Sequence, residues 1–357
     1  MKSLTETGKK IAEQFLTVAP ECYAPKGYEG AAPGGNGQFV MYAVSSLWLN
    51  ALQFSRKAGL KDLEDRLIRH FEPYYEEKSD KCSCRNHVDF SVFGAVPLEI
   101  AVLTADARAL EKGLWYADHQ WEAPDPLDLG DNGNADYETQ MEYLRRGFSP
   151  QSRLWIEDMY MITVLQVQAY LATGDMKYVE RTAAQMDWYL AKMQLPNGLF
   201  HHSATAPFHW GRGNGWVAGG MPLMLENLPV DNPHFGNILA AYRRMMATLL
   251  EYQHPSGLWG QLVDDPDAWD ESSCSGMFTS SMVKGIRHGW LDEKVYGPAV
   301  GKAWDALCGR IDAYGNVGGT GAGINCQSER RGYLECPTVN GAPHGQAAML
   351  WTINAML

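Results

Sequence analysis

Hydrophobic positions along this chain recur mostly at helical spacing, and several of the segments that they form end in the same kind of turn. Four stretches pass from an apolar segment through small residues into a second periodic segment, at 54–62, 103–110, 170–178 and 285–296. Alternation of apolar and polar residues, which indicates strands, is weak throughout. The pattern therefore predicts a chain of helices joined in pairs.

A short motif that repeats sets the length of one unit. The segments KMQLPNGLFHH (192–202) and EYQHPSGLWGQ (251–261) share the pattern Q-x-P-[NS]-G-L-aromatic, and Gln194 and Gln253 lie 59 residues apart. A helix pair with its loops takes about this length, and six units of about 59 residues would fill the chain. We therefore predict an all-α fold, an (α/α)6 barrel of six helical hairpins, in a single domain over residues 1–357. The segments 122–150 and 312–345 are predicted to be long irregular loops at one end of the barrel.

The N-terminal segment is typical of an amphipathic helix, with Ser3 and Glu6 in the spacing of a capping box. It has no apolar run of signal-peptide length, and no segment approaches the roughly 20 apolar residues of a membrane span. We therefore expect a cytoplasmic protein without membrane contact, or a periplasmic one if a leader was removed. Apolar residues on outer helices would allow a homo-oligomer.

Composition excludes some functions. The net charge of -12 argues against binding to nucleic acid. The seven cysteines include Cys82 and Cys84 in a C-x-C pair, which no nearby residues extend to a zinc site. We expect reduced cysteines, no metal and no cofactor.

Two acidic residues open an otherwise apolar helix at 154–171, Glu157 and Asp158. In one interpretation they favour the helix dipole and pair with Arg153 or Arg145. In the other, one of them is an acid with a raised pKa that takes part in proton transfer. Adjacent helical residues point about 100° apart, so only one is expected to face a central cleft.

Asp89 stands before a second apolar helix in the segment 85–100. It is either the N-cap of that helix or the second carboxylate of a pair. Two carboxylates from different helices are what glycosidic chemistry commonly uses.

The stretch HWGRGNGW (209–216) places Trp210, Arg212 and Trp216 on a backbone rich in glycine. Aromatic faces pack against the C–H faces of sugars, arginine binds carboxylates, and glycine lets the backbone approach a ligand. The motif thus predicts a site for an acidic sugar. The alternative is a glycine-rich helix start packed by core tryptophans.

Histidines 201, 202, 209 and 344 are predicted to lie in loops beside these segments. The segment 270–278 offers hydroxyl groups at the start of another helix, and these hydroxyls either cap that helix or contact a ligand. The residues expected to bind substrate are Arg212, Trp210, Trp216, His202, His209, Asn214, Tyr42 and His344.

The same segments resemble the unsaturated uronyl hydrolases of glycoside hydrolase families 105 and 88, which include unsaturated rhamnogalacturonyl hydrolase. The similarity rests on WGRGNGW, NGLFHH, LWIEDMYM and the segment GLWGQLVDDPDAWDESSCSGMF, in the order of the family. It implies an (α/α)6 barrel and an acidic oligosaccharide substrate. It also implies hydration of the C4=C5 bond of a terminal unsaturated uronic acid, in which an acid protonates C4 and a carboxylate activates the water that adds at C5.

By this resemblance Asp89 matches one of the two important acids, and His202 a histidine of the cleft. The family usually has aspartate where this chain has Glu157, so either Glu157 or the neighbouring Asp158 is expected to be the principal acid. With this glutamate in place of aspartate, the chain also resembles glycoside hydrolase family 154, whose members release saturated β-glucuronic acid. A saturated β-glucuronidase is therefore the alternative, and a non-catalytic glycan-binding barrel and a sugar epimerase remain further ones.

Overall fold

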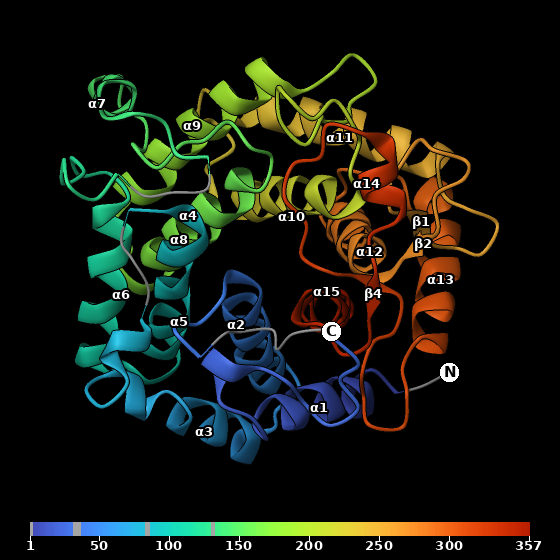
Figure 1. Cartoon of the computed structure of the whole chain (residues 1–357), viewed down its shortest axis with the longest axis horizontal. Coiled ribbons are helices and arrows are strands. Elements are labelled where there is room, and N and C mark those ends of the chain that lie inside the picture. The colour runs from blue at the N-terminus through green and yellow to red at the C-terminus, as the bar shows by residue number, and fades with distance from the viewer. Residues whose placement is uncertain (1–2, 31–36, 83–85, 130–132) are drawn as a thin grey trace.

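The computed structural model, which describes residues 3–30, 37–82, 86–129 and 133–357, arranges its long helices in two concentric rings (Figure 1). The inner ring consists of α2 (Tyr42–Lys57), α5 (Ala95–Thr104), α8 (Asp158–Thr173), α10 (Gly211–Asn227), α12 (Ser272–Arg287) and α15 (Pro343–Met356). The outer ring consists of α1 (Leu4–Phe15), α3 (Lys61–Arg69), α6 (Ala107–His119), α9 (Lys177–Met193), α11 (Phe235–Glu251) and α13 (Glu293–Gly309). Each inner helix contacts the next, and α15 returns to α2, so the ring is closed. The predicted all-α (α/α)6 barrel is confirmed.

Short turns join each inner helix to the outer helix that follows, and left-handed residues make most of them. Gly59, Gly174 and Gly289 have φ of 67°, 73° and 68°, and Ala105 has φ of 59°. A left-handed residue lets a helix end and the chain reverse within a few residues. These four positions lie in the four turns that the sequence pattern predicted.

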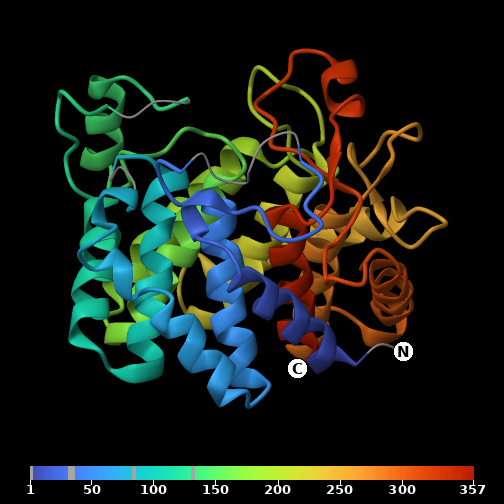
Figure 2. The same cartoon turned by 60° about the horizontal axis from the view of Figure 1, so that its bottom comes forward.

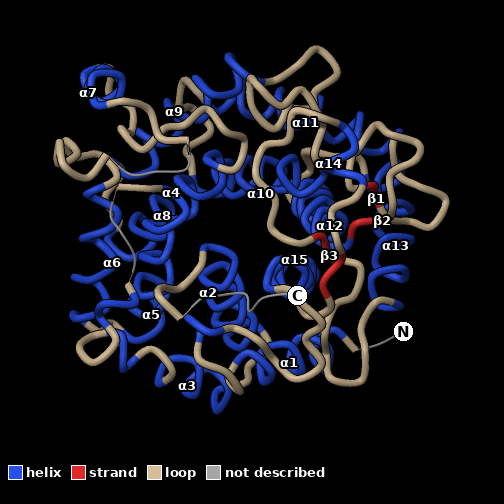
Figure 3. Tube along the Cα trace, in the orientation of Figure 1, coloured by secondary structure: helices blue, strands red, loops and turns tan. Residues whose placement is uncertain are grey.

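Long loops join each outer helix to the next inner helix, and they gather at the opposite end of the barrel (Figure 2). Figure 3 shows that they contain little regular structure. The short elements in them are α4 (Val88–Ser91), α7 (Tyr137–Arg145), α14 (Arg330–Leu334), the strands β1 (Trp259–Gly260), β2 (Asp270–Glu271), β3 (Thr320–Gly321) and β4 (Thr338–Val339), and 3-10 turns at Pro20–Cys22, Glu72–Tyr74, Ser79–Lys81 and Val92–Gly94. β1 pairs with β2 and β3 with β4, both antiparallel.

The prediction of irregular structure over 122–150 is wrong for part of that segment. Helix α7 lies within it, because Asp136 accepts a hydrogen bond from the backbone N–H of Thr139 and so caps the helix. The predicted loop 312–345 likewise contains α14, β3 and β4.

The repeated motif forms the same turn twice. The Nε2 of Gln194 donates to the carbonyls of Gly198 in its own turn and Ala241 on α11. The Nε2 of Gln253 makes the equivalent bonds, to Gly257 and to Ala299 on α13. The motif therefore fastens the end of one outer helix to the next outer helix.

The N-terminal helix covers the junction between α2 and α15. The backbone N–H of Glu6 lies 3.4 Å from the Ser3 hydroxyl, as the predicted cap requires, and α1 packs on α2 and α15 through its buried face. Ile11, Ala12 and Phe15 on that face are at most 1% exposed. Chain segments more than 300 residues apart thus share one core.

Two findings bear on the remaining sequence predictions. Within the described ranges, no helix has both the length and the apolar content needed to cross a bilayer. The structure shows no disulfide bond among the cysteines in those ranges, and Cys84 lies outside them.

Candidate active site

The first turns of the inner helices meet at the end of the barrel that carries the long loops. Tyr42 begins α2, Asp158 begins α8, and Arg212 and His344 are the second residues of α10 and α15. Because every inner helix runs in the same direction, the positive ends of their dipoles point to this mouth. The mouth is therefore electrostatically suited to an anionic group.

Glu157 is the N-cap residue of α8 and one of its carboxylate oxygens is bound by a histidine. The Nε2 of His202 lies 3.3 Å from its Oε1, and the Nδ1 of His202 lies 2.6 Å from the Tyr333 hydroxyl. The other oxygen, Oε2, is buried and has no hydrogen-bond partner among the described residues. Glu157 thus offers one unoccupied carboxylate oxygen beside a histidine.

Arg153 joins the two remaining carboxylates. Its Nη1 and Nη2 donate to the two oxygens of Asp89 at 3.2 and 3.1 Å. Its Nε and Nη2 donate to Oδ1 of Asp158 at 2.9 and 2.7 Å, and the Tyr189 hydroxyl and the Arg153 backbone N–H donate to Oδ2. Asp158 is fully buried with both oxygens occupied, whereas the Asp89 side chain is 18% exposed.

This arrangement decides between the interpretations of the two neighbouring acids. Asp158 pairs with Arg153, as the structural interpretation predicted, and it is inaccessible to a ligand. Full burial and the hydrogen bonds to both of its oxygens favour Glu157 over Asp158 as the principal acid, and this assignment stays a prediction. Asp89 is also not the N-cap of α4, since the His87 ring accepts the hydrogen bond from its backbone N–H.

The electrostatics of Glu157 differ from the expected raised pKa. Burial raises the pKa of Glu157, but the positive charges of His202 and Arg153 and the hydrogen bond from His202 outweigh burial and hold it below its ordinary value. Burial lowers the pKa of His202, yet the Glu157 carboxylate and a hydrogen bond with Cys326 raise it to about 9. At neutral pH the pair is a carboxylate and an imidazolium, which hold one transferable proton.

A turn under strain positions these groups. Leu154 has φ of 57°, which is unusual for leucine and is found where the surrounding structure imposes it. The residues on either side of it, Arg153 and Trp155, stack with the guanidinium carbon 4.8 Å from the ring centroid. Trp155 is half-buried, and its ring also meets that of His202. It is an aromatic side chain beside Glu157 that remains partly accessible.

Arg212 lies deeper than the sequence suggested. It is fully buried, and it donates to the carbonyls of Gly321 at 2.9 Å and Ala322 at 2.6 Å, with Glu271 3.8 Å away. Its guanidinium also stacks on Trp210 at 4.8 Å. In this structure Arg212 holds β3 and supplies a fixed positive charge rather than a free carboxylate contact.

The glycines of the WGRGNGW motif serve helix packing. A Cβ on Gly211 would lie 2.6 Å from the carbonyl of Gly260, and one on Gly215 would lie 2.6 Å from the sulfur of Met277 on α12. They let α10 approach its neighbours, whereas close approach of the backbone to a ligand was the expectation.

Trp216 and its neighbours form a plug across the barrel. Its ring centroid lies 5.0 Å from that of Tyr160 on α8 and 5.5 Å from that of Trp351 on α15. We call Trp216, Tyr160 and Trp351 the aromatic plug. Trp216 is fully buried and Trp210 is 1% exposed, so their predicted stacking on a sugar is not possible without movement.

Tyr42 lies on the loop side of the plug, where several charges converge. Its hydroxyl lies 2.8 Å from Nε2 of His344, and its ring meets that of Trp216. Burial raises the pKa of Tyr42, and the charges of Arg212, Asp89, Glu157 and Arg153 all act on it. Burial and the charge of Arg212 keep the pKa of His344 well below its ordinary value, so its ring is neutral at pH 7.

Two predicted ligand contacts lie elsewhere. The Nδ1 of His209 lies 2.8 Å from Asp264 and its ring contacts His201, outside this group. Asn214 is fully buried and bonded to the backbone of Phe200 and Trp210, so it fastens the turn before α10. The predicted residues that the structure brings together are Asp89, Glu157, Asp158, His202, Trp210, Arg212, Tyr42, Trp216 and His344.

The sequence predicted Arg153 as a partner for one of the two neighbouring acids, but it did not show that Arg153 also binds Asp89. It gave no sign of two further contributors. Tyr333 and Glu271 reach the site from distant loops, and no spacing in the sequence connects them to Glu157 or Arg212.

No group of three or more histidine, cysteine, aspartate or glutamate side chains in the described part of the chain has a geometry that could hold a metal ion.

Comparison with known proteins gives a consistent result. Residues 139–357 match the model of Glycosyl Hydrolase Family 88. The chain is 30% identical over 215 residues to an unsaturated 3S-rhamnoglycuronyl hydrolase of Formosa agariphila, covering 57% of this chain and 50% of that protein. It is 31% identical over 191 residues to an unsaturated rhamnogalacturonyl hydrolase of Bacillus subtilis, covering 51% and 54%. The chain thus matches about half the length of these relatives.

Solved structures share the fold along nearly the whole chain. A protein of Klebsiella pneumoniae described as a possible member of the GH105 family superposes with a TM-score of 0.80 at 19% identity, covering 99% of this chain and 92% of that one.

Proposed function

We propose, from the premise that this chain belongs to glycosyl hydrolase family 88, that it removes a terminal unsaturated uronic acid from an acidic oligosaccharide by hydrating the C4=C5 bond. The two relatives compared above are both named as unsaturated uronyl hydrolases, which favours this substrate class over a saturated β-glucuronide.

The observation that carries the proposal is the unoccupied Oε2 of Glu157. This atom is buried at the barrel mouth, and the oxygen beside it is bound to a histidine whose pKa is about 9. A proton bound at Oε2 would make Glu157 a carboxylic acid beside a ligand, while the hydrogen bond from His202 holds the other oxygen, Oε1. A group that can both give and take a proton at one position is what hydration of an enol ether requires.

The protons balance across the reaction. Glu157 donates a proton to C4, the positive charge forms at C5 and the ring oxygen, and water adds at C5. The water loses its own proton to a carboxylate, either Glu157 or Asp89, so no net proton is consumed. The resulting hemiketal opens and releases the neighbouring sugar.

Asp89 suits the second role because it is anchored yet accessible. Arg153 holds both of its oxygens, and its side chain remains 18% exposed. Each carboxylate oxygen that accepts one hydrogen bond keeps a further lone pair for a water molecule. Asp89 is thus placed to orient the water that attacks C5.

The uronate carboxylate is proposed to lie beside Tyr42 and His344. The positive charge of Arg212 acts on both residues, and the N-termini of the inner helices lie at the same end of the barrel. Trp155 is the accessible aromatic side chain that would pack against the sugar. Arg212 then stabilises the anion through its field rather than by a direct contact.

A paired assay tests the proposal. One disaccharide carries an unsaturated terminal uronic acid and the other the saturated acid with the same linkage. The unsaturated substrate should lose its alkene absorbance, while the saturated one should release no reducing sugar. Turnover of only the saturated substrate would replace the proposal with the β-glucuronidase alternative, and turnover of neither would refute both.

A further inference from the structure

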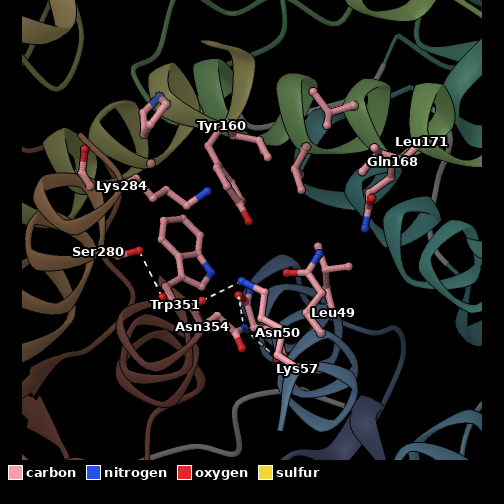
Figure 4. Close-up of a pocket in the computed structure, with 17 residues that line it drawn as sticks. Leu49, Asn50, Lys57, Tyr160, Gln168, Leu171, Ser280, Lys284, Trp351 and Asn354 are labelled. Atoms are coloured by element: carbon pink, nitrogen blue, oxygen red, sulfur yellow. Dashed lines mark hydrogen bonds between the residues drawn. The ribbon is translucent and has the colours of Figure 1, made fainter. Parts of the chain in front are cut away.

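A second pocket opens at the other end of the barrel, below the aromatic plug. It lies between the inner helices α2, α8, α10, α12 and α15. Tyr160 and Trp351 form its inner end, and Tyr160, Trp351 and Lys284 extend toward its open middle (Figure 4). We call it the distal pocket. None of its lining residues belongs to the candidate active site.

The distal pocket has room for a small organic molecule. Water-sized molecules can occupy about 100 Å³ of it, several times the roughly 10–15 Å³ that holds one water. Lys57 lies at its rim, where the side chain is exposed. A ligand could therefore enter without passing the plug.

Polar atoms without partners line the buried part. The indole Nε1 of Trp351, Oδ1 of Asn354 and Oε1 of Gln168 have no hydrogen-bond partner among the described residues, and these side chains are at most 7% exposed. Buried polar atoms normally have partners, because each one left unpaired costs about 1–3 kcal/mol. One donor and two acceptors are matched by a ligand that carries hydroxyl groups.

Positive charge surrounds the entrance. Lys57 donates to the backbone carbonyl of Asn354 at 2.6 Å and forms no ion pair in the described part of the chain. Burial lowers the pKa of Lys57, and the neighbouring charges of Lys284 and Arg287 lower it further than Glu226 and Glu99 raise it. Lys284 is already paired with Glu226 at 2.6 Å. Lys57 is therefore the cation whose charge an anionic ligand would neutralise.

We propose that the distal pocket binds a small hydroxylated carboxylate, a sugar acid, with its carboxylate on Lys57 and its hydroxyls on Trp351, Asn354 and Gln168. The wall formed by Tyr160 and Trp351 gives its C–H face an aromatic surface to pack against. The acids, histidines and arginines of the candidate active site are not among the residues that line the distal pocket.

Calorimetric titration of the full chain with D-glucuronate tests the proposal, with D-glucose as the neutral probe of similar size. Glucuronate should bind and glucose should bind at least about tenfold more weakly, because a charge-assisted contact is lost. Lys57→Met and Trp351→Phe should each weaken glucuronate binding, the first by at least about tenfold. Lys192→Met is the matched control, since Lys192 is an exposed lysine of α9 outside the pocket, and it should bind as the wild type does.

Glucuronate could also occupy the catalytic mouth, so a second measurement locates it. A crystal soaked with glucuronate should show its carboxylate within hydrogen-bond distance of the Lys57 Nζ. Ligand seen only beside Glu157, or unchanged affinity in Lys57→Met, would overturn the proposal. Equal affinity for glucose, or no binding of glucuronate, would also overturn it.

Discussion

At the scale of single residues, Glu157 and Asp158 show how one step along a helix separates two roles. Side chains one position apart point about 100° from each other. Asp158 therefore turns into the protein, where Arg153 and Tyr189 occupy both of its oxygens. Glu157 turns to the mouth and keeps Oε2 without a partner. Of these two neighbouring acids, Glu157 is the one proposed to exchange a proton with a ligand.

Glu157→Gln should abolish turnover of the unsaturated disaccharide while the protein stays folded. Glutamine cannot deliver a proton, and general acid catalysis contributes about 10²–10⁴ in rate. The measurement is the initial rate together with the thermal unfolding midpoint.

Asp158→Asn is the comparison for that variant. It leaves Arg153 with one carboxylate, and breaking a buried pair costs about 3–5 kcal/mol, so it should lower stability far more than Glu157→Gln does. A Glu157→Gln enzyme with wild-type rate would remove the assigned role.

The Glu157–His202 pair should make stability depend on pH. The pKa of His202 is about 9 in the folded chain, above about 6.5 in the unfolded one. The imidazolium of His202 therefore contributes up to about 3 kcal/mol to the free energy of unfolding. This contribution is complete below about pH 6.5 and is lost as the pH rises through 9. The free energy of unfolding, measured by denaturant titration, should therefore fall between these values by more in the wild type than in His202→Gln. Parallel curves for the two proteins would show that the imidazolium does not stabilise the fold.

At the scale of elements, the same turn ends three successive outer helices. Gly198, Gly257 and Gly315 have φ of 82°, 96° and 92°, and each lies against the next outer helix, at Arg244, Lys302 and Lys10. The third contact joins α13 to α1 and so links the two ends of the chain. The sequence showed the first two copies because they share the Q-x-P-[NS]-G motif. It did not show the third, in which Ile311 stands in place of the glutamine. There the carboxylate of the next residue, Asp312, accepts a hydrogen bond from the backbone N–H of Asn316.

Gly257→Ala should destabilise the protein by about 1–3 kcal/mol, because alanine is strained at this positive φ. Its Cβ would also lie 2.6 Å from the carbonyl oxygen of Lys302. Gly301→Ala is the control, since Gly301 is an exposed position within α13 with no atom near its Cβ, and it should stabilise by up to about 1 kcal/mol. Denaturant titration of both variants measures the difference. Equal effects would mean that the turn does not hold the ring.

At the scale of the whole molecule, closure couples the two ends of the chain. The inner ring has no free end, since α15 contacts both α12 and α2, and α1 covers that junction. Residues from both ends share one hydrophobic cluster with α5 and α8. We infer that the chain from residue 1 to 357 behaves as a single domain.

A single cooperative unfolding transition is therefore expected in calorimetry, with equal calorimetric and van't Hoff enthalpies. Phe15→Ala, which removes a fully buried ring of α1, should lower the free energy of unfolding by about 3–5 kcal/mol. The protein should still unfold in one transition. Two resolved transitions, or unfolding of α1 separately from the rest of the protein, would contradict a single domain.

The sequence by itself determined the architecture and pointed to the segments of the site. Helical spacing, left-handed turn residues and a repeat of 59 residues are local properties, so they predicted the hairpins and their closure without knowledge of contacts. Motif order likewise identified the segments around Asp89, Glu157 and His202.

Only the tertiary structure decided which side chains are free and which are bound. The burial of Arg212 under β3, the occupation of Asp158 by Arg153, and the contact of Tyr333 with His202 depend on loops far apart in the chain. Whether an ionisable group is a partner or a reagent depends on its hydrogen bonds and burial. These are properties of the folded neighbourhood, and the residue type and spacing do not contain them.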